Sequence, residues 1–110
     1  MHFSIVSGDT LPHLIVSLIQ NDQPLDVTDS TIVFKMRADD TCINDDVTLG
    51  GTCVIDDAVS GSIHYAWNST DTANPGTYHG QFHITYVSGD KLTVPSSGSI
   101  AILVNPRIGI

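Results

Sequence analysis

The side chains in this sequence that could bind a metal or catalyse a reaction are twelve aspartates, five histidines and two cysteines. Adjacent aspartates at Asp39–Asp40, Asp45–Asp46 and Asp56–Asp57 form the kind of carboxylate cluster that gives calcium its oxygen ligands. An EF-hand needs an Asp-x-Asp-x-Asp-Gly loop with a later glutamate, and the chain has neither. We therefore interpret these pairs as solvated acids at turns and expect no metal there.

Two histidines, His79 and His83, are four residues apart, a spacing that would place both imidazoles on one face of a helix. In the strand expected here the same spacing separates them by about 13 Å, too far for both to bind one zinc ion. The other histidines, His2, His13 and His64, lie at scattered strand positions and form no motif. The sequence therefore predicts no histidine metal site and no bound cofactor.

The sequence also contains no motif for nucleophilic catalysis or phosphate binding. The chain lacks a Gly-x-Ser-x-Gly elbow, and Gly50–Gly51 has neither the lysine nor the helix that follows in a phosphate-binding loop. Cys42 and Cys53 are separated by ten residues and are expected to be free thiols, with a disulfide as the alternative. We therefore expect no catalytic residue and a protein that is not an enzyme.

The charge of the chain limits its partners. Four basic residues against twelve acidic ones give a net charge of −8, and so acidic a surface repels nucleic-acid phosphates and anionic lipid head groups. No apolar run is long enough to span a bilayer, and the start of the chain does not read as a secretory signal. We expect a protein made in a cytoplasm, with neither nucleic acid nor a membrane as its partner.

The elements that would position these groups have the alternating polarity of β-strands. Every acid is an aspartate, which favours turns, and valine, isoleucine and threonine are abundant, so an all-β fold is predicted. Alternation is clearest between residues 77 and 86, where His79 and His83 are predicted to face outward. The residues of this segment that should enter the core are Tyr78, Phe82, Ile84 and Tyr86.

Further strands are expected wherever short apolar or alternating runs lie between turn signals such as Asn74–Gly76 and Ser88–Asp90. Strands at such regular intervals are typical of a sandwich in a single domain, which we place at residues 1–105, followed by a C-terminal tail at residues 106–110. The expected strands are His2–Ser7, Leu11–Ile19, Thr31–Arg37, Val47–Leu49, Thr52–Asp56, Ser62–Trp67, Lys91–Val94 and Ser99–Asn105.

One loop has the residues of an immunoglobulin-type corner. Asp71, Gly76 and Tyr78 match the corner in which a tyrosine hydroxyl bonds to the backbone of the loop that crosses between the sheets. Trp67 is expected to pack in the core or at an edge rather than to form a platform for sugars. Gly80 stands where an antibody domain has its second cysteine, so an antibody-like disulfide is excluded. The pattern predicts an immunoglobulin-like antiparallel β-sandwich.

An ordered set of motifs extends this likeness to residues 7–104: Gly8–Pro12, Pro24–Thr28 followed by Ile32–Arg37, Gly61–Trp67, and Leu92–Pro95. With these motifs the chain resembles the N-terminal immunoglobulin-like domain of phage upper baseplate proteins and related tail or head accessory proteins. Larger members of that family continue into domains that carry receptor-binding proteins. Because this sequence stops at Ile110, the resemblance implies only an attachment or decoration role.

The resemblance implies a structural accessory protein of a tailed-phage virion, part of the tail or baseplate or a capsid decoration, that binds other virion proteins and copies of itself. The alternative is a carbohydrate-binding or adhesive module, which would need exposed aromatic side chains, yet aromatics are only 6% of residues and mostly fall at core positions. Two uncharged or apolar segments, His2–Ser7 and Pro106–Ile110, are predicted to make the protein contacts.

Overall fold

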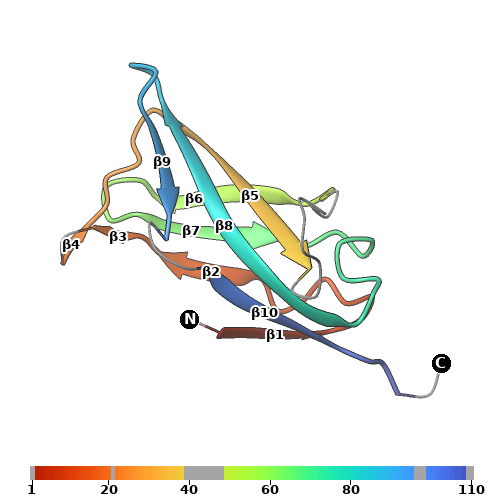
Figure 1. Ribbon diagram of the computed structural model, residues 1–110. Coiled ribbons are helices and arrows are strands. Elements are labelled where there is room, and N and C mark those ends of the chain that lie inside the picture. The colour runs from red at the N-terminus through yellow and green to blue at the C-terminus, as the bar shows by residue number, and fades with distance from the viewer. Residues whose placement is uncertain (1, 21, 39–48, 96–98, 109–110) are drawn as a thin grey trace.

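The computed structural model describes residues 2–20, 22–38, 49–95 and 99–108, and every regular element in these ranges is a strand. The all-β prediction is therefore confirmed, and no helix able to cross a membrane occurs among these residues. The strands, shown in Figure 1, are β1 (His2–Val6), β2 (Leu14–Ser17), β3 (Ile19–Gln20), β4 (Gln23–Pro24), β5 (Ser30–Ala38), β6 (Thr52–Asp57), β7 (Ser62–Ala66), β8 (Gly76–Tyr86), β9 (Lys91–Val94) and β10 (Ile100–Asn105).

The larger sheet has five strands arranged around β8, the longest strand. Along one edge β8 pairs with β5, and along the other edge it pairs first with β10 and then with β9. These pairings are antiparallel, whereas β1 adds to the outer side of β10 in parallel. The first and last strands of the described chain therefore lie side by side (Figure 1).

The smaller sheet has the order β2-β7-β6, with all pairs antiparallel and an irregularity in register between Ile55 and Asp57. A separate ribbon joins β3 to β4. Figure 1 shows the strands of the smaller sheet crossing those of β5 and β8 at an angle. The sheets contact each other through aromatic rings: the Phe34 ring on β5 lies 4.9 Å, centroid to centroid, from the Tyr65 ring on β7.

The core lies between the two sheets and takes alternate residues from their strands. On β8, Tyr78, Phe82 and Ile84 are buried as predicted, Tyr86 is half-buried, and His83 is exposed. His79 is half-buried rather than fully outside. Alternation along a strand sends neighbouring side chains to opposite faces, so this pattern fixes the register of β8 against the core.

One predicted strand is wrong in its extent. The sequence predicts a single strand over Leu11–Ile19, but β2 begins only at Leu14 and ends before Leu18. The Leu18 N–H donates to the Gly61 carbonyl at 2.9 Å, and the Leu18 carbonyl accepts from the Leu25 N–H at 2.9 Å. The chain thus changes its pairing partner at this buried residue, and β3 leaves the smaller sheet to pair with β4. Of the expected strand Val47–Leu49, residues 47 and 48 lie outside the described residues, and Leu49 is not in a strand.

Candidate interaction surface

The loop between β7 and β8 is held from inside by the Asp71 carboxylate. Asp71 is only 3% exposed and accepts hydrogen bonds from the Tyr65 hydroxyl at 2.8 Å, the Asn68 N–H at 2.9 Å and the Gly50 N–H at 2.7 Å. Hydrogen bonds to a carboxylate are stronger than those between neutral groups, and here they compensate for its burial. Asp71 therefore ties the loop to β7 and to the segment before β6.

The predicted tyrosine corner is present in the same loop. The Tyr78 hydroxyl donates to the Asn74 carbonyl at 2.6 Å, which closes the loop just before β8. Trp67 is also buried as predicted, and its ring stacks on Phe3 of β1 with centroids 5.7 Å apart. Its indole N–H has no hydrogen-bond partner within the described part of the chain. The loop is therefore rigidly attached to both sheets.

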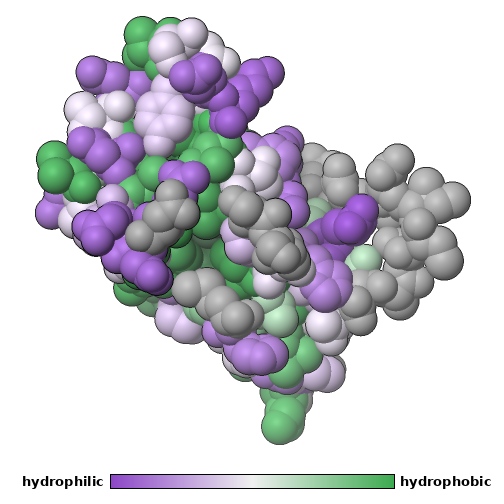
Figure 2. Space-filling model, turned by 60° about the vertical axis from the view of Figure 1, so that its left-hand side comes forward, coloured by the Kyte–Doolittle hydropathy of each residue, from purple (hydrophilic) through white to green (hydrophobic). Residues whose placement is uncertain are grey.

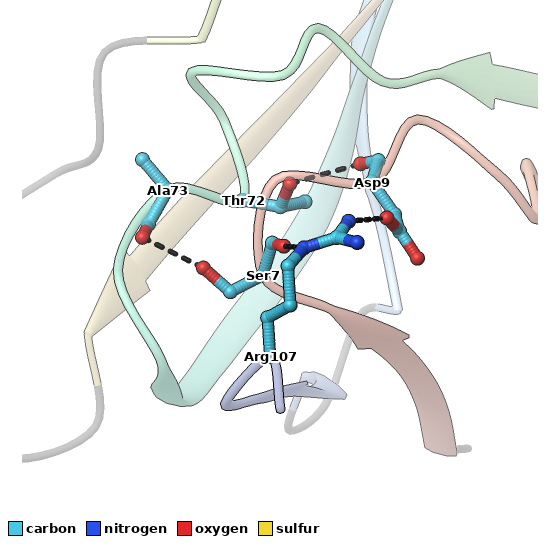
Figure 3. Close-up of polar contacts among 5 residues, drawn as sticks. All are labelled: Ser7, Asp9, Thr72, Ala73 and Arg107. Atoms are coloured by element: carbon cyan, nitrogen blue, oxygen red, sulfur yellow. Dashed lines mark hydrogen bonds and ion pairs between the residues drawn. The ribbon is translucent and has the colours of Figure 1, made fainter. Parts of the chain in front are cut away.

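A second set of polar contacts joins this loop to both ends of the chain (Figure 3). The Arg107 Nε donates to the Ser7 carbonyl at 3.1 Å, and its guanidinium also pairs with the Asp9 carboxylate. The Ser7 hydroxyl donates to the Ala73 carbonyl and the Thr72 hydroxyl to the Asp9 carbonyl, each at 2.9 Å. We call this set of residues the Arg107 clasp.

The Arg107 clasp holds the start of the C-terminal tail against the segment after β1. Pro106 and Arg107 follow β10 and are exposed, but Arg107 is fastened to the segment after β1. Ile108 comes next and is 97% exposed, so the one described isoleucine of the predicted tail does extend into solvent. The other, Ile110, lies outside the described residues. An exposed isoleucine next to an arginine that is held by hydrogen bonds is suited to contact another protein.

Strand β1 borders the same region. It pairs with β10 on one side and carries no Lys, Arg, Asp or Glu. Within the described residues no strand pairs with its other edge, which leaves backbone N–H and C=O groups for a strand of another chain. We call β1, residues 7–9 and residues 106–108 together the terminal surface.

The histidines predicted not to bind a metal are distributed over both sheets. His79 and His83 share the outer face of β8, and the described residues contain no group of three potential metal ligands. Sequence reasoning missed one cluster: His64 Nδ1 lies 2.8 Å from Asp56 Oδ2, and the His13 ring stacks on the His64 ring at 5.0 Å. Only the pairing of β2, β7 and β6 brings these residues together, and that register cannot be read from their spacing.

The cysteines and the aspartate pairs are the other titratable groups that the sequence analysis considered. Cys53 is half-buried without a disulfide partner among the described residues, and desolvation raises the pKa of its thiol to about 11. Cys42 and the pairs Asp39–Asp40 and Asp45–Asp46 lie outside the described residues. Asp56 and Asp57 are the last two residues of β6, so the interpretation of this pair as turn residues is wrong. Asp57 Oδ1 accepts from the Ser60 N–H at 3.4 Å, and Asp56 lies beside His64.

Comparison with known families gives one match, and it covers nearly the whole chain. Residues 4–107 match the family described as the BppU N-terminal domain, the N-terminal domain of the phage baseplate upper protein. A comparison with curated proteins finds no match. The matched span includes residues 4–9 and 106–107 of the terminal surface, but not His2, Phe3 or Ile108.

Proposed function

Because the chain belongs to the family of phage baseplate upper protein N-terminal domains, we propose that it is a structural accessory component of a tailed-phage virion. The observation that carries the proposal is the match over residues 4–107, which leaves only the extreme ends of the chain outside the family. The protein acts through protein–protein contacts, as part of the tail or baseplate or as a capsid decoration. It is made in the host cytoplasm and then becomes part of the particle.

The fold is an immunoglobulin-like sandwich spanning residues 1–105, with residues 106–110 as a tail. This assignment is supported by the two sheets β1-β10-β8-β5 and β2-β7-β6 and by the Tyr78 corner. Gly80 replaces the antibody cysteine, and a Cβ atom there would lie 2.6 Å from Cζ of Phe34. The Phe34 ring thus fills the space that a disulfide would cross, and its aromatic contact with Tyr65 joins the sheets instead.

The terminal surface is the part of the molecule that docks onto another virion protein or another copy. Its edge strand offers unpaired backbone groups without a charged side chain to prevent pairing, and Ile108 adds apolar area beside it. The Arg107 clasp fixes both parts in advance, so docking costs less ordering entropy.

The partners are proteins rather than nucleic acid, membrane or sugar, and the domain performs no catalysis. Its net charge of −8 disfavours phosphate backbones and anionic lipids. The three phenylalanines, three tyrosines and one tryptophan are all buried or half-buried, so no aromatic side chain is free to stack on a sugar. This burial speaks against the adhesive alternative.

Incorporation into particles tests both the role and the surface. Phage particles assembled with the complete chain, or with a chain lacking residues 108–110, are purified, and the amount of chain per particle is measured by immunoblot. The truncation keeps Arg107, so its melting temperature is expected to match that of the complete chain. Ile15→Ser, at an exposed isoleucine on the smaller sheet, is the matched control.

We expect the complete chain and Ile15→Ser to be incorporated equally, and the truncated chain to be incorporated less. If the complete chain is absent from purified particles, the structural role is wrong. If the truncated chain is incorporated normally, the role stands but residues 108–110 are not part of the contact.

A further inference from the structure

Basic and acidic side chains lie on different parts of this protein, although its net charge is strongly negative. The five strands of the larger sheet contain no acidic residue, although the chain has twelve. They carry three of its four Lys and Arg residues: Lys35 and Arg37 on β5 and Lys91 on β9. All three are exposed, because they alternate with the core residues Phe34, Met36 and Leu92 and so lie on the outer face. We call this outer surface of β5, β8 and β9 the cationic face.

None of the three cations on this face has a partner among the residues that the structure describes. The fourth cation of the chain, Arg107, pairs with Asp9. By contrast, Lys35, Arg37 and Lys91 form no ion pair and no side-chain hydrogen bond with any described residue. None of their neighbours across the strands is acidic: Arg37 lies opposite His79, Lys35 opposite Gln81 and Lys91 opposite Thr85.

The cationic face also has a shallow depression with an exposed aliphatic side chain. The depression lies between β5, β8 and β9, and the outward-facing residues Val33, Lys35, His83, Thr85, Lys91 and Thr93 line it. Val33 is 43% exposed although it is an aliphatic residue in the middle of a strand. Cations around an exposed aliphatic side chain form a surface that an acidic protein segment can cover, with burial of Val33 adding to charge attraction.

The complementary charge occurs on the same chain at one end of the molecule. Asp26, Asp29, Asp57 and Asp90 are all exposed, and none forms an ion pair with a described residue. Backbone contacts hold their segments together: the Asp29 carbonyl accepts from Val87, the Asp90 carbonyl from Tyr86, and the Ala58 carbonyl, next to Asp57, from Val27. Figure 2 turns this end toward the viewer and shows hydrophilic residues around exposed hydrophobic ones. We call these four aspartates the acidic end.

We propose that the cationic face of one copy binds the acidic end of a second copy. The proposal rests on the structural role proposed above, and it adds a contact that the terminal surface does not use. Face and end adjoin at Asp90 and Lys91 but use different residues, so a contact between them is head-to-tail and can continue into a ring or a row of copies. A nucleic acid fits the cationic face less well, because four basic residues stand against twelve acidic ones in the chain.

Charge reversal on each surface tests this contact with the complete protein. Lys35→Glu with Lys91→Glu reverses the face and changes the net charge from −8 to −12, because each substitution removes one positive and adds one negative charge. Asp57→Lys with Asp90→Lys reverses the end and changes it from −8 to −4. Association is measured by sedimentation velocity at about 20 mM and about 500 mM NaCl, since salt screens exposed charges. Urea denaturation confirms that each variant is folded.

The wild-type protein is expected to sediment faster as its concentration rises at low salt, and to sediment as a monomer at high salt. Each double variant alone is expected to be monomeric at both salt concentrations. An equimolar mixture of the two is expected to associate again, because each reversed surface meets its opposite on the other variant. This rescue also controls for net charge, which differs in opposite directions in the two variants.

Three results would overturn the proposal: a wild type without salt-sensitive association, salt-sensitive association of either variant alone, or a mixture that associates no more than the separate variants. Association that salt does not change is assigned to the terminal surface instead. The variants are also carried through the particle-incorporation measurement. Loss of self-association with the chain still present in particles leaves the structural role intact, whereas absence of the complete wild-type chain from particles refutes that role.

Discussion

The hydroxyl of Tyr78 is the residue-scale feature whose structural effect is easiest to isolate. Its bond to the Asn74 carbonyl closes the loop before β8, so Tyr78→Phe is expected to lower the free energy of unfolding by about 1 kcal/mol with the fold intact. Tyr86→Phe is the matched control, because its hydroxyl bonds to the Asp26 carbonyl at an exposed site at 3.1 Å and should cost less. Urea denaturation measures the free energy of unfolding of both variants. Equal losses would show that the Tyr78–Asn74 bond stabilises the fold no more than the exposed Tyr86 bond does.

Two protonated groups make the protein sensitive to alkali. Burial raises the pKa of Cys53 from 9.0 to about 11, and burial together with the Asp71 carboxylate raises the pKa of Tyr65 above its ordinary 10.0. In the unfolded chain both groups lose their protons at lower pH than in the folded protein, so stability is present below about pH 9 and falls as the pH rises toward 11. Urea midpoints at several pH values measure this fall, and Cys53→Ala is expected to reduce it. A midpoint that rises with pH over this range would contradict the two shifts.

Single residues were predictable where their role is local in sequence. Tyr78 bonds to a residue four positions before it, and Trp67 follows a strand whose alternation places it inside. The Arg107 contact with Asp9 spans 98 residues, and no spacing rule predicts a contact of that kind. The His64–Asp56 pair could not be predicted either, because it depends on the register between β6 and β7.

At the scale of the element, β8 gives the sharpest test of register. Phe82 is 0% exposed and its ring lies 4.9 Å from the Phe34 ring, so Phe82→Ala is expected to cost about 3–5 kcal/mol through lost burial and a cavity. His83 is the next residue and faces outward, so His83→Ala is expected to cost under about 0.5 kcal/mol. Thermal and urea unfolding measure both variants. Similar losses in the two would mean that the assignment of faces is wrong.

Strands were predictable to within a residue or two when alternation continued up to a turn. The predicted strand Lys91–Val94 has the same bounds as β9. The predicted strand 31–37 is one residue shorter at each end than β5. The expected strand Leu11–Ile19 divides because Leu18 bonds to Gly61 on one side and Leu25 on the other. A long apolar run does not reveal such a change of partner, since both halves keep the same pattern of polarity.

For the whole molecule, composition indicated the class of fold but not the location of any contact. A net charge of −8 suggests an evenly acidic surface, yet the larger sheet has no acidic residue in its strands. Only the pairing of β5 with β8 and β9 shows that Lys35, Arg37 and Lys91 share one face. The terminal surface likewise exists because β1 and β10 are neighbours and Arg107 reaches back to Ser7.

An electron microscopy map of purified phage particles tests the central claim of a structural virion component most directly. We expect density for this chain at a fixed and repeated position, with its terminal surface against a neighbouring virion protein. A map in which other proteins account for all of the density, from particles that contain no peptide of this chain, would contradict it.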